Sequence, residues 1–258
     1  MTEEFSRTES LLGAEAMNLL QNARVAVFGV GGVGGYVVEA LARSGVGAID
    51  LIDSDTVSRS NINRQIIALH STVGRYKVDV MRERILDINP HCRVQAHRCF
   101  FLPETRDQFD FSQYSYVVDA VDTVAAKIQL IVQAREAGVP VISSMGAGNK
   151  LNPAGFEIAD IYKTSVCPLA KVLRKELRQR GLKNLKVVYS REEAMKPLVP
   201  IISGENTDDN ASQKEENAVR RRSTPGSVAF VPSVAGLLLA SEVIKDLVCV
   251  KTHKNLKE

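Results

Sequence analysis

The feature that most limits what this chain can fold into is a glycine-rich turn between an apolar run and a helical pattern. Residues 24–28 read RVAVF and residues 29–34 read GVGGVG, and apolar side chains then recur at helical spacing over residues 33–43. A second apolar run, residues 48–52, ends at Asp53. This order of strand, glycine loop, helix and strand is typical of a nucleotide-binding βαβ unit, because glycines let phosphates approach the backbone and a helix N-terminus favours negative charge.

The same alternation continues along the chain. Apolar residues at helical spacing predict a helix over residues 74–89, which Pro90 ends, and a second helix over residues 124–138. Short β-rich runs predict further strands at residues 93–96, 116–120 and 139–143. Strands that alternate with helices are typical of a mostly parallel sheet with both faces covered. We therefore predict an α/β, Rossmann-like fold with a mostly parallel sheet.

The pattern changes beyond Gly148. The elements predicted there are a strand at 156–162, a basic helix at 169–180, a strand at 185–190 and a core helix at 234–248. We expect them to extend the same domain, so that residues 1–258 form one unit with a nucleotide-binding portion at 5–148 and a second portion at 149–258. Residues 203–224 have almost no apolar side chains, so burial cannot offset the entropy of ordering them. We expect a mobile loop over a site there.

Composition is that of an ordinary soluble protein. Of the 258 residues, 45% are hydrophobic and 24% are charged, and the formal net charge of +3 is too small to demand a nucleic-acid partner. The longest uncharged stretch, residues 227–241, contains Pro232 and is shorter than the roughly 20 apolar residues of a membrane span. Four widely spaced cysteines and a polar N-terminus indicate a reducing compartment and no signal peptide. We expect a cytoplasmic protein without a membrane partner.

The loop glycines and Asp53 are the first candidates for nucleotide contacts. Asp53 follows its strand at the position where a carboxylate accepts hydrogen bonds from ribose hydroxyls. The candidate glycines are Gly29, Gly31, Gly32 and Gly34. NAD-dependent dehydrogenases use the same glycines and the same acidic residue, so this motif alone leaves the identity of the nucleotide open.

A dense polar cluster after the second strand favours ATP. Residues 53–57 read DSDTV, and residues 60–65 read SNINRQ. A carboxylate that attacks a triphosphate is repelled by it, so adenylation needs fixed cations on the phosphates and usually Mg²⁺. Arg64 and Lys77 can supply these cations.

Asp122 is the candidate metal ligand. It follows the strand at 116–120, and open α/β sheets gather their ligands at the carboxyl ends of strands. The alternative is that Asp55, Asn61 and Asp122 are turn or cap residues and that Lys77 is a solvated helix charge.

The polar cluster and the glycine loop together resemble the ubiquitin-activating-enzyme-like superfamily that includes ThiF, MoeB and HesA, over roughly residues 5–148. The resemblance implies that MgATP binds, that a substrate carboxylate attacks the α-phosphate and that pyrophosphate leaves. It implies that Asp53 binds the ribose and that Asp122 serves the magnesium. The residues expected to bind the nucleotide are Gly29, Gly31, Gly32, Gly34, Asp53, Asp55, Asn61, Arg64, Gln65 and Lys77.

Arg7 lies in the sequence FSRT, where members of that superfamily place an arginine that reaches into the ATP site of the partner subunit. A homodimer is therefore implied by the resemblance. The expected catalytic residues are Arg64, Lys77, Asp122 and Arg7.

Within the superfamily, the second half of the chain resembles the tRNA threonylcarbamoyladenosine dehydratase (TcdA) branch. The resemblance rests on residues 6–9 (SRTE), 146–150 (GAGNK), 160–161 (DI), 167–170 (CPLA) with Arg174, 226–227 (GS) and 231–233 (VPS). It implies that the activated carboxylate belongs to the threonyl group of a modified adenosine beside the tRNA anticodon. Collapse of the adenylate would close a ring and release AMP, a net loss of water. Residues 149–258 would then serve the substrate and the dimer.

A basic segment in the second half could contact the tRNA backbone. Its candidate residues are Lys171, Arg174, Lys175 and Arg178, and more positive charges follow at 180, 183, 186 and 220–222. A solvated helix face is the ordinary explanation of such charges, and the resemblance is what favours tRNA contact.

Two other functions stay open on the residues alone. One is adenylation of the C-terminal glycine of a ubiquitin-like sulfur-carrier protein, and the other is a redox enzyme or nucleotide sensor. The chain has no CxxC pair for the structural zinc common in MoeB-like and ThiF-like enzymes, which favours the dehydratase and predicts no zinc. Cys167 is either a nucleophile activated by nearby positive charge or a plain helix-start residue. Which tRNAs are used, whether a sulfur-transfer protein takes part and whether a monovalent cation binds also stay open.

Overall fold

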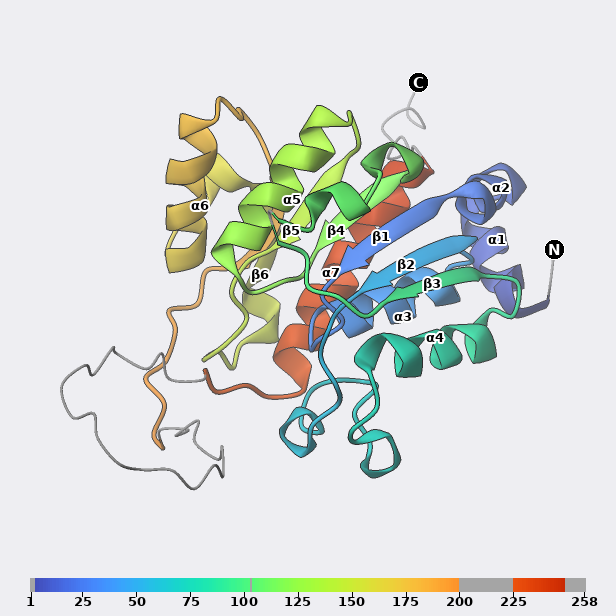
Figure 1. Cartoon of the computed structure of the whole chain (residues 1–258), viewed down its shortest axis with the longest axis horizontal. Coiled ribbons are helices and arrows are strands. Elements are labelled where there is room, and N and C mark those ends of the chain that lie inside the picture. Colours follow the sequence, from blue (N-terminus) through green and yellow to red (C-terminus); the bar gives the residue numbers. More distant parts are fainter. Residues whose placement is uncertain (1–2, 103, 200–224, 249–258) are drawn as a thin grey trace.

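A seven-stranded sheet forms the centre of the molecule, with its strands in the order β3-β2-β1-β4-β5-β7-β6 (Figure 1). The computed structural model describes residues 3–102, 104–199 and 225–248. The strands are β1 Arg24–Phe28, β2 Ala48–Ile52, β3 Arg93–His97, β4 Tyr116–Asp119, β5 Val141–Ser144, β6 Phe156–Asp160 and β7 Lys186–Ser190. Every neighbouring pair is parallel except β6 and β7, which are antiparallel. The predicted α/β, mostly parallel fold is confirmed.

The central strands bury both of their faces. In β1, Val25 and Val27 pack into the hydrophobic core on one side of the sheet, whereas Ala26 and Phe28 pack into the core on the other side. This division follows from the two-residue period of a strand. It explains why the central strands are continuous apolar runs in the sequence, as expected for a sheet covered on both faces.

Helices supply these covers (Figure 1). One face carries α2 Ala14–Asn22, α3 Gly34–Arg43, α4 Lys77–Ile88 and α7 Phe230–Leu247, and the other carries α5 Val124–Glu136 and α6 Pro168–Gln179. The short helix α1 Ser6–Leu12 precedes α2. Helix α7 packs so closely on α3 that a Cβ on Gly236 would lie 2.4 Å from the carbonyl oxygen of Val33. The last described helix is therefore part of the core beneath the glycine loop.

The boundaries of α4 differ from the prediction. The helix begins at Lys77 and not at Gly74, whose φ of +87° is left-handed and ends regular structure. The amides of Gly74 and Lys77 donate instead to the carbonyls of Val57 and Asp55. These bonds place the start of α4 beside the polar cluster that follows β2.

Other elements also differ from the prediction. Helices α1 and α2 were not predicted, β6 ends at Asp160 instead of residue 162, and α7 begins at Phe230 instead of residue 234. Pro232 fits inside α7 because it lies in the first turn, where a missing amide removes no helical hydrogen bond.

The carboxyl ends of β1, β2, β4 and β5 meet at one edge of the sheet. The strand order reverses between β1 and β4, and open α/β sheets bind ligands at such a switch point. The predicted mobile loop at 203–224 lies outside the described residues, and the described chain resumes at Pro225 beside this edge. Within the three described ranges, no helix is both long enough and apolar enough to cross a membrane.

Candidate nucleotide-binding site

A cavity of about 440 Å³ opens at the carboxyl edge of the sheet. Its walls come from the glycine loop and from the segments that follow β2, β3, β4 and β5, and residues 225–227 complete it. Of the residues predicted from the sequence, the cavity brings together Gly29, Gly31, Gly32, Asp53, Asp55, Asn61, Arg64, Gln65, Lys77 and Asp122. A cavity of this size, with polar groups that converge on it, is in the usual range for a small-molecule site.

The glycines of the loop serve two different purposes. A Cβ on Gly29, whose φ is +90°, would lie 2.7 Å from the carbonyl oxygen of Ala120, and a Cβ on Gly34 would lie 1.8 Å from that of Gly29. These two glycines therefore allow close packing of backbone, and Gly34 is not among the residues that line the cavity. A Cβ on Gly31 would meet only the side-chain nitrogen of Gln65, at 3.8 Å. Gly31 thus leaves open space at the N-terminus of α3, where a phosphate is favoured.

Asp53 connects the glycine loop to the end of β2. Its Oδ2 accepts the amide of Val30 at 2.7 Å, and its Oδ1 accepts the amide of Asp55 at 2.8 Å. Each carboxylate oxygen can accept a second hydrogen bond, so the half-buried side chain still has acceptors for ribose hydroxyls. The two backbone bonds fix the direction in which these acceptors point.

Lys77 is the first residue of α4, and its side chain is buried in the cavity wall. Its Nζ lies 2.6 Å from Oδ2 of Asp55, whose side chain is 53% exposed. The pair places an ammonium group beside a carboxylate, and both residues line the cavity.

Arg64 is held above the glycine loop by its neighbours. Its guanidinium donates to the carbonyl of Ser60 at 2.9 Å and to Oδ1 of Asn63 at 2.9 Å. Burial lowers the pKa of Arg64 from its ordinary value. Among the residues that the structure describes, no carboxylate pairs with this guanidinium. A half-buried cation without an anion is unfavourable, so the site favours an anionic ligand here.

Two buried polar atoms in the cavity wall also lack partners. They are Oγ of Ser54 and Oε1 of Gln65, neither of which makes a hydrogen bond within the described chain. Buried polar atoms usually have partners, so unpaired ones in a cavity indicate a ligand that supplies them. Asn61 differs, because its Oδ1 already accepts the amide of Ser58 at 3.1 Å. Together with the open space at Gly31, these atoms fit a polar nucleotide.

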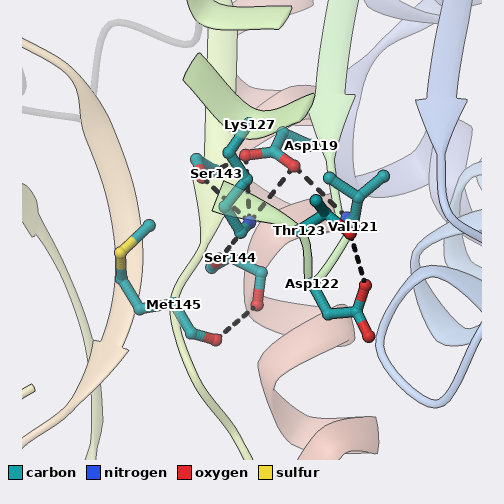
Figure 2. A network of polar contacts seen from close by, with 8 residues as sticks. All are labelled: Asp119, Val121, Asp122, Thr123, Lys127, Ser143, Ser144 and Met145. Carbon is teal, nitrogen blue, oxygen red and sulfur yellow. Dashed lines mark hydrogen bonds and ion pairs between the residues drawn. The ribbon is translucent and has the colours of Figure 1, made fainter. Parts of the chain in front are cut away.

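Asp122 is exposed in the turn that follows β4, and it lines the cavity. Within the described chain, the hydroxyl of the neighbouring Thr123 lies 3.4 Å from its Oδ1 (Figure 2). The described residues contain no group of three or more His, Cys, Asp and Glu side chains that could hold a metal ion. A single carboxylate nevertheless fits Mg²⁺, which is commonly bound by one or two carboxylates together with substrate phosphates and water.

A buried ionic network beneath this turn was not predicted. Asp119 and Lys127 are both fully buried, and Nζ of Lys127 lies 3.0 Å from the carboxylate of Asp119 (Figure 2). One signal in the sequence could have identified it, because Lys127 shares a helix face with the apolar residues Ile131 and Ala134. A lysine within an apolar stripe indicates a buried partner.

Asn149 joins three segments at the rim of the cavity. Its amide donates to the carbonyl of Gly226 at 2.8 Å, and its Oδ1 accepts the amide of Gly226 at 2.6 Å. Its carbonyl accepts the amide of Met195 at 2.8 Å. Asn149 has a φ of +58°, a left-handed value that asparagine tolerates better than most residues. These bonds fix Gly226 and Ser227 as one wall of the cavity.

Arg7 lies far from the cavity of its own chain. It is exposed on α1, and the preceding Phe5 packs beside Gly45, at the amino end of β2. Figure 1 shows α1 at the edge of the sheet opposite to the carboxyl ends of β1 and β2.

The predicted tRNA-contact residues lie on α6 and do not line the cavity. Lys171, Lys175 and Arg178 are exposed, and the guanidinium of Arg178 lies over the ring of Tyr162. Arg174 is half-buried, and it donates to the hydroxyl and the carbonyl of Thr164. It therefore stabilises the turn before α6, so its guanidinium is not a free surface charge.

Two cysteines differ in their relation to the site. Cys167 is buried in the core as the residue before α6, where it packs among apolar side chains away from the cavity lining. Cys99, which the sequence did not single out, lines the apolar wall of the cavity with Phe101.

The ThiF family pattern matches residues 5–258 of this chain. The chain is similar to the tRNA threonylcarbamoyladenosine dehydratase of Bacillus subtilis (strain 168), with 47% identity over 259 residues that cover 100% of both chains. It is similar to the crystal structure of E. coli tRNA N6-threonylcarbamoyladenosine dehydratase, TcdA, in complex with ATP, with 34% identity, a TM-score of 0.81 and coverage of 96% of this chain and 94% of that one. It is also similar to the probable adenylyltransferase/sulfurtransferase MoeZ of Mycobacterium tuberculosis, with 37% identity over 131 residues that cover 51% of this chain and 33% of that protein.

Proposed function

The chain belongs to the ThiF family, and we propose that it is an ATP-dependent tRNA threonylcarbamoyladenosine dehydratase that works by carboxylate adenylation. The observation that carries the proposal is the match to a dehydratase over the whole of both chains, at 47% identity. The cavity at the carboxyl edge of the sheet supplies the groups that this chemistry needs.

ATP is the nucleotide that the cavity residues suit. Gly31 leaves room at the N-terminus of α3 for the phosphates, and Asp53 offers acceptors for the ribose hydroxyls. Ser54 and Gln65 each bring a buried polar atom that needs a partner. The apolar wall beside Cys99 and Phe101 suits the base.

The fixed cations act on charge that moves during the reaction. The carboxylate of the substrate attacks the α-phosphate, and pyrophosphate carries away the electrons of the broken phosphoanhydride bond. Arg64 and Lys77 stabilise this charge, because they are already oriented by Ser60, Asn63 and Asp55. Mg²⁺, when bound at Asp122, would neutralise part of the phosphate charge.

Collapse of the adenylate completes the dehydration. A nucleophilic atom of the same modified nucleoside attacks the activated carbonyl carbon, a ring closes and AMP leaves. One carboxylate oxygen departs with AMP, and a proton is lost from the attacking atom. The nucleoside therefore loses the elements of water, and no thioester to the enzyme is required, consistent with the buried position of Cys167.

The alternative substrate was the C-terminal glycine of a sulfur-carrier protein. The adenylyltransferase/sulfurtransferase relative matches only 51% of this chain, whereas the dehydratase relative matches all of it. The comparisons therefore support the dehydratase over the carrier-activating function.

We further infer a homodimer in which Arg7 completes the site of the partner subunit. Arg7 lies at the edge opposite to its own cavity, so it could reach an ATP site only across a subunit interface. Arg7→Ala and Lys77→Met enzymes should each be inactive, but an equal mixture should recover about a quarter of the activity, because half of the dimers are mixed and each has one intact site. No recovery on mixing would contradict a role for Arg7 in the partner's site.

The tRNA would approach along the exposed side of α6, where Lys171, Lys175 and Arg178 are free of carboxylate partners within the described chain. Its phosphates would attract these cations. We place the enzyme in the cytoplasm with its tRNA substrate.

The decisive experiment follows the carboxylate oxygen. Purified protein is given MgATP and tRNA that carries ¹⁸O-labelled threonylcarbamoyladenosine, with the same tRNA lacking the modification as the control. We expect AMP and pyrophosphate release with the modified tRNA alone, ¹⁸O in the AMP and loss of water from the nucleoside. Loss of water without label in AMP would exclude an acyl-adenylate, and the absence of any reaction would exclude the dehydratase.

A further inference from the structure

The buried ion pair of Asp119 and Lys127 lies directly beneath two walls of the nucleotide cavity. Asp119 is the last residue of β4 and is 0% exposed, and Lys127 lies in the first turns of α5 and is 1% exposed. Nζ of Lys127 lies 3.1 Å and 3.0 Å from the two carboxylate oxygens. Ser143 of β5 donates its hydroxyl to the same carboxylate at 2.5 Å. Figure 2 shows these side chains converging between the ends of β4 and β5.

The first wall depends on Asp119. Its Oδ1 accepts the amide of Val121 at 3.2 Å, which sets the turn that carries Asp122 (Figure 2). The backbone of Ala120 in this turn is the surface against which Gly29 packs. The carboxylate of Asp119 thus fixes both the candidate metal ligand and the support of the glycine loop.

The second wall depends on Lys127. Its ammonium group donates to the carbonyl of Ser144 at 2.7 Å, at the end of β5. The chain then continues through Met145 to Ala147 and Gly148, which line the cavity. One cation therefore joins the turn after β4 to the loop after β5.

Stability alone does not explain this arrangement. Taking a carboxylate and an ammonium out of water is costly, and replacing a buried pair by apolar side chains of similar volume is often neutral or stabilising. Apolar side chains, however, could not make directional hydrogen bonds to the backbone. The pair satisfies a backbone amide on one side and a backbone carbonyl on the other, and both belong to segments that line the cavity.

We propose that Lys127, together with Asp119, is a positioning element of the adenylation site that holds the Asp122 turn and the residue 147–148 wall in register. This inference rests on the proposed function. The inference goes beyond that function by assigning a role to residues that do not touch the nucleotide. Small displacements of a catalytic group can cost about 10²-fold in rate, so a positioning element is expected to act on kcat.

The test uses the double variant Asp119→Asn/Lys127→Met in the full chain. Removing one partner alone would leave an unpaired buried charge and could unfold the protein, whereas the double variant removes both charges and nearly conserves volume. The matched control is Tyr116→Phe, which deletes a half-buried hydrogen bond to Asp246 at the other end of β4. Three quantities are measured: the melting temperature, kcat for AMP release, and the Kd of ATP with and without Mg²⁺.

We expect the double variant to melt cooperatively and to bind metal-free ATP within about threefold of the wild type, but to lose at least about tenfold in kcat and most of the Mg²⁺-dependent gain in ATP affinity. Tyr116→Phe should lower the melting temperature and leave the other two quantities unchanged. A double variant with wild-type kcat and wild-type Mg²⁺ dependence would overturn the proposal. If the wild type itself released no AMP with modified tRNA, the proposed function would fail, and the Mg²⁺ dependence of ATP binding would still decide the role of the pair.

Discussion

Arg24 binds the carboxylate of Asp50 through two hydrogen bonds of equal length, 2.9 Å from Nε to Oδ1 and 2.9 Å from Nη2 to Oδ2. Asp50 is 1% exposed in the middle of β2, and His97 and Tyr114 also lie within hydrogen-bond distance of it. Burial acts to raise the pKa of Asp50, but the hydrogen bonds from His97 and Arg24 outweigh it and hold the pKa below its ordinary value. The folded state therefore favours the ionised carboxylate.

This relationship predicts how the free energy of unfolding depends on pH. A carboxyl group whose pKa is lowered by folding stabilises the protein above its unfolded pKa of about 3.9, and that stability is lost as the pH falls through the folded pKa. Asp50→Asn should cost about 3 kcal/mol at pH 7, and the cost should shrink below about pH 4. Urea unfolding at several pH values measures it. Asp107→Asn, at a side chain that is 90% exposed, is the control, and a cost that does not change with pH would contradict the prediction.

The two kinds of loop glycine should respond differently to alanine. Gly34→Ala places a methyl group where backbone stands, at 1.8 Å from the Gly29 carbonyl oxygen, and should cost at least about 2 kcal/mol of unfolding free energy. Gly31→Ala meets nothing nearer than 3.8 Å and should leave stability unchanged while it weakens ATP binding. Thermal unfolding and calorimetric titration with ATP separate the two effects. Equal stability of the two variants would show that Gly34 is not a packing residue.

Lys77 should contribute more to the reaction than to nucleotide affinity. Lys77→Met removes a buried ammonium at the cavity and should lower kcat by roughly 10²- to 10³-fold, while the Kd of ATP rises by much less. Arg75→Met is the matched control, since Arg75 lies two residues away, pairs with Glu83 and does not line the cavity. Single-turnover AMP release gives the rate. A variant that lost affinity and rate in equal proportion would point to ground-state binding instead.

Cys99 offers a chemical probe of the cavity. Burial raises the pKa of the Cys99 thiol, and it raises the pKa of Cys92 to about 11. The thiolate is the reactive form, so iodoacetamide at about pH 9 should modify Cys99 slowly and Cys92 hardly at all. ATP should protect Cys99, because this residue lines the site, as peptide mass spectrometry can quantify. Modification of Cys99 at the same rate with saturating ATP would place the nucleotide elsewhere.

The exposed cations of α6 predict how tRNA binding depends on the salt concentration. Lys171→Gln and Lys175→Gln should each weaken tRNA binding and reduce the slope of log affinity against log salt by about 0.7 to 0.9 if the side chain neutralises one phosphate. The catalytic rate at saturating tRNA should not change. Lys245→Gln, which removes a cation paired with Glu242 on α7, is the control. An unchanged slope in both α6 variants would remove α6 from the tRNA interface.

The sequence could predict those parts of the site that are local in the chain. The glycine loop and Asp53 follow their strands directly, and the 60–65 cluster lies in the segment between β2 and α4, so the ends of parallel strands determine where they lie. The polar cluster already favoured ATP, and the family resemblance added the identity of the substrate. Even there, the role of Gly34 could be assigned only from the structure, because a packing glycine and a phosphate-binding glycine look alike in a motif.

Other features depend on contacts that a local pattern does not contain. Asp119 and Lys127 form a pair only because β4, β5 and α5 meet, and the two partners of the Asn149–Gly226 bond are 77 residues apart. Arg174 looked like a surface cation, but the turn at Thr164 folds back beneath it. In each case a polar side chain satisfies backbone groups brought close by the fold, and helical spacing cannot reveal which groups those are.

The three hydrogen bonds of Asn149 have a consequence for how the chain can be divided. Met195 precedes residues 200–224 and Gly226 follows them, and both are bound to Asn149. A polypeptide cut within that stretch would leave the whole sheet in one fragment, and one cavity wall and α7 in the other. Because α7 packs against α3 and the wall completes the nucleotide cavity, ATP should bind only when the fragments associate. The protein is therefore suited to a split reporter in which nucleotide binding measures the reunion of two polypeptides.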